Sequence, residues 1–463
     1  MPSPAEISRR AAVGVLAAGA VGFLTFGGRT KQQQPPRGRL VLDYWEKWTG
    51  HEGAAMQRVV DAFNASQDRL WVRYLITTTI HQKALVSILG GNPPDVLGLY
   101  AFNVPSYAEA NALLPLEDLA APAGLALTDY APGMRPIMQF GGRWYATINT
   151  GGTLAMYWNR SIFRECADAL RARGLSSEEP PRTIEELDAA HEAICRVKGG
   201  GTLGSGPLER AGFLHMEPGW WSWIWPYYFG GSLYDPAGDR ALAASAECVR
   251  AYEWVESYTR KLGVEHAEKF RTGFGPYGTP QSAFLTGEVA MVVQGPWMAN
   301  LIKAFKPDLD YGVAPMPVAK DVYDPAAPVA CIDTDVLMIP RGAKHPEASM
   351  EFVAFTQRQE NVEALATAHC KGSPMVKVSD AFLANHPNRG VQLHTSLASS
   401  PRAFIAPPTP VWPEYKDLFD TTMMDLWKLA EPAATRLPSI QARAQAMLDQ
   451  ARAYKVTRGE LPA

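Results

Sequence analysis

The chain has 463 residues, of which 47% are hydrophobic and 20% charged, and its formal net charge is -3. This length exceeds what one hydrophobic core usually supports, so we expect a globular protein with two lobes or domains. The slight negative charge, without a basic stripe, disfavours nonspecific attraction to nucleic acid. Five cysteines, with no CxxC pair and no Cys/His ligand spacing, indicate buried free thiols and no metal site.

Residues 1–38 are expected to precede the fold. Ser8-Arg9-Arg10 is followed by an uncharged run over residues 11–26, which is typical of a twin-arginine signal peptide. The run is shorter than the roughly 20 residues that cross a membrane core. It has no clear cleavage site and no lipid-accepting cysteine, so both cleavage and retention as an N-terminal anchor stay open. Residues 31–38 then read as a polar tether, and the folded part is expected in the periplasm or on the outer face of the cytoplasmic membrane.

The fold is predicted to begin with alternating strands and helices. Extended apolar runs over residues 39–45, 70–77 and 95–100 are separated by two segments of helical periodicity. Such a βαβαβ order predicts an α/β fold with a parallel sheet, whose ligands bind at the carboxyl ends of the strands. The turns at residues 46–51 and 100–103 follow the first and third strands and lie at those ends.

The middle of the chain changes character. Residues 141–163 contain two extended apolar runs separated by Gly151-Gly152, which favours a crossing between lobes over a helix. A later helix is predicted to begin with the capping box of Thr183 and Glu186.

Tryptophan is concentrated in residues 219–235. If this segment is helical, Trp221 and Trp225 share one face, and Trp220 and Trp223 share another. We then expect at least one pair to border a cleft, with ordinary core packing as the alternative.

A second aromatic surface is predicted after a short buried strand within residues 287–301. A helix end at residues 283–286 precedes this strand, and another strand is predicted within residues 308–318. The strand ends in Gly295-Pro296-Trp297, a rigid turn that presents one indole. This indole either packs in the core or offers a flat face to a ligand.

The order of these segments resembles family 1 of the extracellular solute-binding proteins, the sugar-binding subunits of ABC importers that include the maltodextrin-binding proteins. The resemblance extends over nearly the whole mature chain, and its most specific element is GEVAMVVQGPW. It is carried by LVLDYWEKWTG, GGNPPDVLGLY, YAEANALLPLEDL, GRWYA, MYWNRSIF, AFLTGEVAMVVQGPW, LDYGVAPMP and IPRGAKHPEASMEFVAFT.

The resemblance implies a two-lobed α/β clamshell with three crossings between the lobes. An N-terminal lobe would contain residues 39–148 and 331–372, and a C-terminal lobe residues 149–330 and 373–463. A sugar would bind in the cleft and shift the population toward the closed form. The monomeric, loaded protein would then meet a membrane permease driven by a cytoplasmic ATPase. No cofactor is implied.

Ligand contacts are carried over only where positions match. Trp297, in the GPW turn, is the foremost candidate, and structural packing is the alternative for every candidate. The others come from the strand-end turns, the tryptophan-rich segment and a late loop: Trp45, Glu46, Trp48, Tyr100, Asn103, Trp223, Trp225 and Trp412.

Two features depart from the family pattern. Residues 330–335 stand where many relatives are glycine-rich, and Asp333 there either accepts hydrogen bonds from sugar hydroxyls or belongs to a solvated turn. Arg402 either pairs with an anionic ligand group or caps a helix. In the first case an acidic sugar or a phosphorylated polyol becomes an alternative ligand.

An enzyme is the less favoured interpretation. Asp333 and Glu217 in an aromatic cleft would suit a glycoside hydrolase if their separation were right. His51-Glu52 lacks the second histidine of HExxH, and neither GxSxG nor a phosphate-binding loop is present. An adhesin or a ligand carrier for a chemoreceptor would share the fold.

Overall fold

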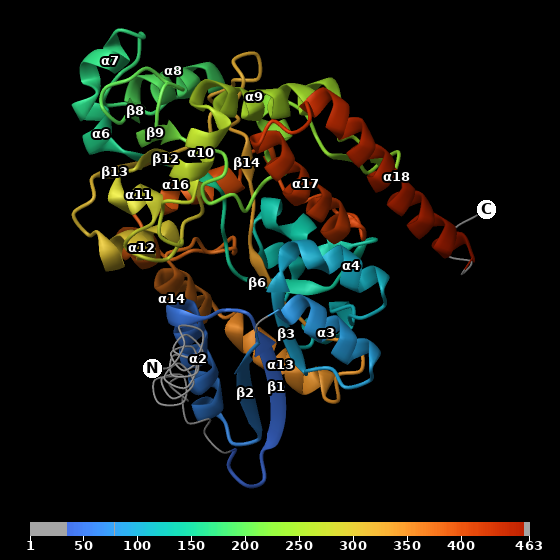
Figure 1. Ribbon diagram of the computed structural model, residues 1–463. Helices are drawn as coiled ribbons and strands as arrows, with labels where there is room; N and C mark the ends of the chain where they lie inside the picture. The colour runs from blue at the N-terminus through green and yellow to red at the C-terminus, as the bar shows by residue number, and fades with distance from the viewer. Residues whose placement is uncertain (1–34, 78, 458–463) are drawn as a thin grey trace, which may run out of the picture.

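The computed structural model describes residues 35–77 and 79–457, which form two lobes, each built around its own sheet (Figure 1). The expected export signal and most of the tether lie outside the described residues. Within these two ranges, no helix combines the length and the hydropathy needed to cross a membrane.

The N-terminal lobe contains a five-stranded sheet in the order β2-β1-β3-β15-β6. Strand β1 pairs in parallel with β2 and β3, as the βαβαβ pattern predicts. Strand β15 returns from late in the chain and pairs antiparallel with β3 and β6. The elements of this lobe are β1 (Leu40–Glu46), α2 (Gly50–Ser66), β2 (Leu70–Ile76), α3 (Ile80–Leu89), β3 (Val96–Tyr100), η1 (Ala101–Asn103), α4 (Val104–Glu109), α5 (Glu117–Ala120), η2 (Leu127–Asp129), η3 (Pro132–Met138), β4 (Gln139–Phe140), β5 (Arg143–Trp144), β6 (Ala146–Thr150), β15 (Asp335–Met338), α13 (Pro346–Thr356) and α14 (Gln359–His369).

The C-terminal lobe contains a second five-stranded sheet in the order β13-β7-β12-β9-β8. All six residues of β12 are buried, which explains why its first five, residues 289–293, are all apolar. The elements are β7 (Ala155–Asn159), α6 (Arg160–Glu165), α7 (Ala167–Arg171), α8 (Ile184–Ile194), β8 (Arg196–Val197), β9 (Leu208–Phe213), η4 (Trp225–Phe229), β10 (Tyr234–Asp235), β11 (Arg240–Ala241), α9 (Ala246–Leu262), α10 (Val264–Arg271), α11 (Ala283–Thr286), β12 (Val289–Gln294), α12 (Met298–Phe305), β13 (Tyr311–Ala314), β14 (Ala330–Cys331), α15 (Asp380–Asn385), α16 (Val391–Ala398), β16 (Ala403–Phe404), α17 (Trp412–Trp427) and α18 (Ala433–Thr457).

The two sheets are joined where the sequence predicts a crossing. Strand β6 ends at Thr150 in the first sheet, and β7 starts at Ala155 in the second. Each sheet has its own hydrophobic core. The exact lobe boundaries and the number of crossings stay predictions.

Main-chain hydrogen bonds tie the segments between the lobes into a strip that we call the hinge ribbon, residues 151–154, 331–333 and 372. Gly151 and Gly372 exchange two bonds, of 2.7 and 3.1 Å between nitrogen and oxygen. The Leu154 amide donates to the Cys331 carbonyl at 2.8 Å, and the Asp333 amide donates to the Gly152 carbonyl at 3.1 Å. The connection is therefore a paired structure and not a set of separate strands.

The tryptophan-rich segment is not the regular helix that its spacing allowed. Residues 219–224 form irregular turns, and a short 3-10 helix begins only at Trp225. Gly219 has a φ of +81°, and Pro226 has no amide hydrogen to continue a helical ladder. The neighbouring indoles therefore point in directions that a helical wheel does not give.

Candidate functional site

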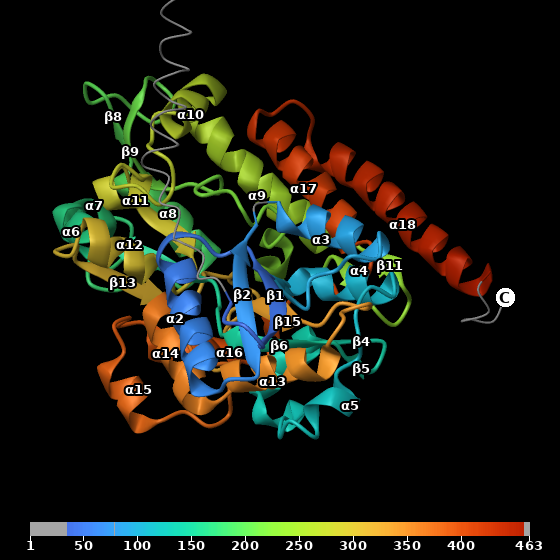
Figure 2. The ribbon, with the colours of Figure 1, turned by 90° about the horizontal axis from the view of Figure 1, so that it is seen from below.

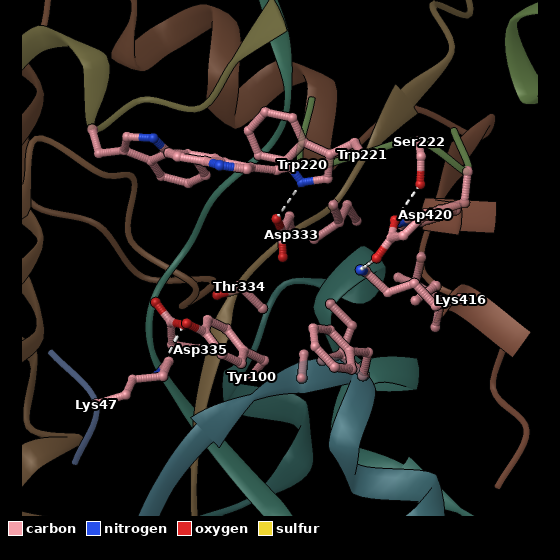
Figure 3. A pocket seen from close by; sticks show the side chains of 18 of the residues that line it. Lys47, Tyr100, Trp220, Trp221, Ser222, Asp333, Thr334, Asp335, Lys416 and Asp420 are labelled. Atoms are coloured by element: carbon pink, nitrogen blue, oxygen red, sulfur yellow. Dashed lines mark hydrogen bonds and ion pairs between the residues drawn. The ribbon is translucent and has the colours of Figure 1, made fainter. Parts of the chain in front are cut away.

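A cavity of about 770 Å³ lies between the lobes. It opens at the carboxyl ends of β1 and β3, where the sequence predicts ligand binding, and Lys47, Trp48 and Tyr100 line it from there. The C-terminal lobe contributes the tryptophan-rich segment and the GPW turn. Figure 3 shows Tyr100 on one side of the cavity and Trp220 and Trp221 on the other.

Aromatic rings of the C-terminal lobe form one wall. The rings of Trp221 and Trp297 are 6.1 Å apart with an interplanar angle of 33°. Trp220 extends the wall, with its ring 5.5 Å from that of Trp221 and 4.5 Å from that of Tyr277. Since Trp220 is 44% exposed, this wall presents ring surface that no protein side chain covers.

The GPW turn has a steric reason for its glycine. A Cβ atom on Gly295 would overlap the six-membered ring of Trp297. Trp297 also donates from Nε1 to Oε1 of Gln294 at 3.2 Å. The indole therefore lies back over the strand end in a fixed orientation, with one side toward the cavity.

The N-terminal lobe supplies a smaller aromatic surface opposite. The rings of Tyr100 and Phe102 are stacked, 5.4 Å apart and 5° from parallel. Tyr100 is 40% exposed. A flat ligand can therefore contact rings on both sides of the cavity.

Two buried lysines hold one carboxylate between them. Nζ of Lys47 is 3.0 Å from Oδ1 of Asp335, and Nζ of Lys371 is 3.0 Å from Oδ2. Trp48 also donates from Nε1 to Oδ2 at 3.1 Å. Nζ of Lys371 is in addition 3.2 Å from the carboxylate of Glu52. The network fixes the start of β15 to the turn after β1.

Opposite charges set the protonation of this network. Burial alone would lower the pKa of Lys47 and of Lys371, but the facing carboxylates outweigh it and raise both. Burial likewise favours the neutral form of Asp335, yet the two ammonium groups hold its pKa below the usual range. All three groups are therefore charged at neutral pH. The Asp335 carboxylate is shared by the two ammonium groups, and Lys47 and Lys371 each lie 3.2 Å from a second carboxylate, that of Glu46 and of Glu52 respectively.

Asp333 is in a different position from Asp335. Burial raises the pKa of Asp333, partly offset by a hydrogen bond of 2.7 Å from Nε1 of Trp221 to its Oδ2. Its side chain reaches into the cavity below the tryptophan wall (Figure 3). At the far end, Asp420 accepts from Ser222 and pairs with Lys416 at 2.5 Å.

Five of the residues predicted from the sequence line the cavity: Trp48, Tyr100, Trp223, Trp297 and Asp333. Six others do not, for different reasons. The side chain of Glu46 turns inward, where it accepts from Tyr44 at 2.6 Å and pairs with Lys47 at 3.2 Å. Trp45 packs against the N-terminal core, and Asn103 is buried in η1.

The remaining three belong to the C-terminal lobe. Trp225 packs in the core, its ring 5.1 Å from that of His215. Trp412 is fully buried, with its ring 5.1 Å from that of Trp223, so it supports a lining residue from behind. Arg402 donates to the carbonyl oxygens of Val322 and Ala327, at 2.8 and 3.4 Å, and is not directed into the cavity.

The structure adds lining residues that the sequence interpretation did not select. Trp220, Trp221 and Asp335 stand in stretches already singled out, and only their orientation was missing. Lys371 and Lys416 had no signal, because each is an isolated lysine in an ordinary pattern. Glu217, the partner of Asp333 in the hydrolase interpretation, is not a lining residue.

A family model described as bacterial extracellular solute-binding protein matches residues 47–363. A maltotriose-binding protein of Pyrococcus abyssi is 22% identical over 340 residues, which are 73% of this chain and 66% of that protein. An uncharacterized ABC transporter extracellular-binding protein of Pyrococcus horikoshii is 23% identical over 421 residues, covering 85% and 87% of the two chains.

A solved structure of CpMnBP1 with mannobiose bound has a similar architecture. Its TM-score is 0.75, with 23% sequence identity over 87% of this chain and 99% of that one. This likeness confirms the expected two-lobed α/β fold.

Proposed function

Since this chain belongs to the bacterial extracellular solute-binding proteins, we propose that it is the exported binding subunit of an ABC importer. It captures a sugar or oligosaccharide between its lobes and delivers it to a membrane permease. It acts as a monomer outside the cytoplasm and catalyses no reaction.

The pair of opposed aromatic surfaces is the observation that carries the proposal. Sugar rings have apolar C–H faces and a polar rim, so they suit a cavity with aromatic walls and charged groups between them. Here Trp297 and Trp221 form one wall and Tyr100 with Phe102 the other, while Asp333 lies between them.

The cavity volume suits a short oligosaccharide. About 770 Å³ is within the range of roughly 300–1,000 Å³ that is usual for small-molecule sites. One of the similar proteins is named for maltotriose, and another was solved with mannobiose bound, which supports a ligand of two or three sugar units.

Several contacts are needed to reach useful affinity. Covering roughly 100 Å² of one indole contributes about 2.5 kcal/mol, whereas micromolar binding needs about 8 kcal/mol. We therefore propose that Trp48, Tyr100, Trp223, Trp297 and Asp333 act together with Trp220 and Trp221. No ligand contact is proposed for the six residues that the structure places away from the lining.

A thermal-shift screen of neutral di- and trisaccharides tests the proposal, because a ligand of the native state raises apparent stability. Hits are checked by calorimetry and by chromatography of the sugar after incubation. We expect micromolar or tighter binding, compaction in solution scattering and unchanged sugar. Hydrolysed product would favour an enzyme, and a panel without any binder would overturn the proposal.

A further inference from the structure

We propose that Asp333 makes the cavity select uncharged sugars over sugars that carry a carboxylate or phosphate group. This inference rests on the proposed sugar binding. It concerns the charge class of the ligand, which the aromatic walls leave open.

Every lysine in the described lining already has a carboxylate partner. Lys47 and Lys371 share Asp335, at 3.0 Å each, and Lys416 is 2.5 Å from Asp420. The described lining includes no arginine. An anionic ligand group would therefore find no lysine without a carboxylate partner in the described lining, and would have to share one whose charge is already partly neutralised.

Asp333, unlike the lysines of the lining, has no partner of opposite charge among the described ion pairs. None of the ion pairs among the described residues includes it, and its hydrogen-bonded side-chain partner is the neutral indole of Trp221 at 2.7 Å. Burial raises the pKa of this carboxyl, as expected for an anion that lacks a close cation. A ligand that displaces water from the cavity must supply a new hydrogen-bond donor to it.

Hydroxyl groups of a neutral sugar can supply that donor. A carboxylate or phosphate on the ligand cannot, and it would add a second negative charge in a cavity where water no longer screens the repulsion. Hydrogen bonds to a charged acceptor are also stronger than those between neutral groups. Asp333 thus favours the binding of neutral sugars and disfavours the binding of sugars that carry a carboxylate or phosphate.

A purely structural role is the competing explanation, because Asp333 also fixes the orientation of Trp221. Asp333→Asn separates the two roles, since the amide oxygen can still accept from the indole while the negative charge is lost. If the role is structural, Asp333→Asn should change the affinity for neutral and for acidic sugars in the same direction. If the role is selective, the variant should bind neutral sugars less tightly and acidic sugars more tightly.

The experiment measures Kd by calorimetry for maltotriose and mannobiose and for their counterparts oxidised at C6 to a uronate. We expect the wild-type protein to bind each neutral sugar at least about 100-fold more tightly than its uronate, and Asp333→Asn to reduce that ratio at least about tenfold. Asp321→Asn, which removes an equal charge from the exposed pair with Arg250, should leave the ratio unchanged.

Equal affinity of the wild type for the neutral and acidic forms would overturn the inference while the proposed function stands. A ratio that does not change in Asp333→Asn would also overturn it. Failure of the wild type to bind any sugar of a wider screen would overturn the proposed function and this inference with it. If Asp333→Asn does not fold, Asp333→Ser, which also removes the charge, takes its place, and an unchanged ratio in that variant overturns the inference.

Discussion

The ammonium group of Lys455 lies 2.8 Å from the carboxylate of Glu109 and 5.5 Å from the centre of the Phe140 ring. Lys455 is in the last turn of α18, a helix that extends from the C-terminal lobe to the level of α4 (Figure 1). Glu109 ends α4 in the other lobe. Figure 2 shows α18 along the outer edge of the molecule, so this contact joins the lobes at a distance from the hinge ribbon.

Lys455→Ala removes a contact that holds the two lobes together, and should therefore weaken ligand binding. Lys455 is not among the residues that line the cavity. A partly exposed ion pair contributes about 0.2–1 kcal/mol, so we expect Kd to rise by no more than about fivefold. High salt should reduce the difference, because the pair is screened. Calorimetry at two salt concentrations measures it, with Lys269→Ala as the control, since that lysine pairs within α10. Equal effects of both variants would argue against an inter-lobe contribution.

Trp297→Ala should weaken sugar binding at least about tenfold, or about 1.4 kcal/mol, because it removes one face of the aromatic wall. Trp297→Phe retains a ring and should recover part of the affinity. Trp71→Ala, in β2 and away from the cavity, is the matched control for loss of an indole. If Trp297→Ala keeps the wild-type affinity by calorimetry, this residue is not part of the site.

Gly295→Ala should have an effect similar to that of removing the indole, although it changes only one methyl group. The added Cβ overlaps the ring of Trp297 and must push it from its present orientation. We expect a loss of affinity of at least about fivefold with a change of the tryptophan fluorescence spectrum. Gly278→Ala is a control for glycine replacement in open space, though its φ of +86° adds backbone strain. Unaltered fluorescence and affinity would contradict the steric argument.

Asp335→Asn should destabilise the protein by about 3 kcal/mol at pH 7, because two buried ammonium groups lose their shared counter-charge. Asp43→Asn removes the half-exposed pair with Arg73 and should cost only about 0–1 kcal/mol. Urea unfolding compares the two. Since the pKa of Asp335 is lowered in the folded state, its contribution is present above about pH 3.9 and is lost on further acidification. Equal losses of unfolding free energy in the two variants would contradict a special stabilising contribution of the buried network.

Buried histidines should make the protein sensitive to mild acid. Burial lowers the pKa of His191 to about 3 and that of His369 and His394 to about 4, and it lowers the pKa of His215 well below the ordinary value. An unfolded histidine takes up its proton near pH 6.5. Their stabilisation is thus present above about pH 6.5 and is lost as the pH falls toward 4, by up to about 1.4 kcal/mol per pH unit for each group.

His215→Phe tests this pH dependence. The imidazole is surrounded by Phe213, Trp225, Trp254 and Tyr258, and neither ring nitrogen has a hydrogen-bond partner. A phenyl ring fits the same environment and cannot be protonated. The free energy of unfolding should therefore fall less between pH 7 and pH 5 in this variant than in the wild type. His81→Phe, at an exposed position, should leave the slope unchanged, and parallel slopes for all three proteins would refute the assignment.

The architecture could be predicted because it depends on periodicity. The strands over residues 40–46, 70–76 and 96–100 and the βαβαβ pairing follow from apolar runs separated by turn residues. The crossing at Gly151-Gly152 was visible for the same reason. Glycines and prolines end an apolar run wherever it occurs, so these features need no knowledge of distant contacts.

The site could be predicted only in part, since it depends on side-chain directions. Trp225 and Trp221 are close in sequence, yet one packs beside His215 and the other faces the cavity. Their difference arises from irregular turns that no residue spacing encodes. Lys371 pairs with Asp335 across 36 positions of sequence. Arg402 donates to carbonyl oxygens of residues 80 and 75 positions away, so its side chain is not available to the cavity.

The hinge ribbon has a consequence for the way in which the lobes can move. Because Gly151 is bonded to Gly372 in both directions and Leu154 is bonded to Cys331, the segments cannot slide past one another without losing hydrogen bonds. A strip paired in this way bends out of its plane more easily than it stretches or shears. We therefore expect the lobes to open by rotation about one axis, through bending of the hinge ribbon. The amide hydrogens of Gly151, Gly372 and Leu154 should then stay protected from exchange with solvent in the open state.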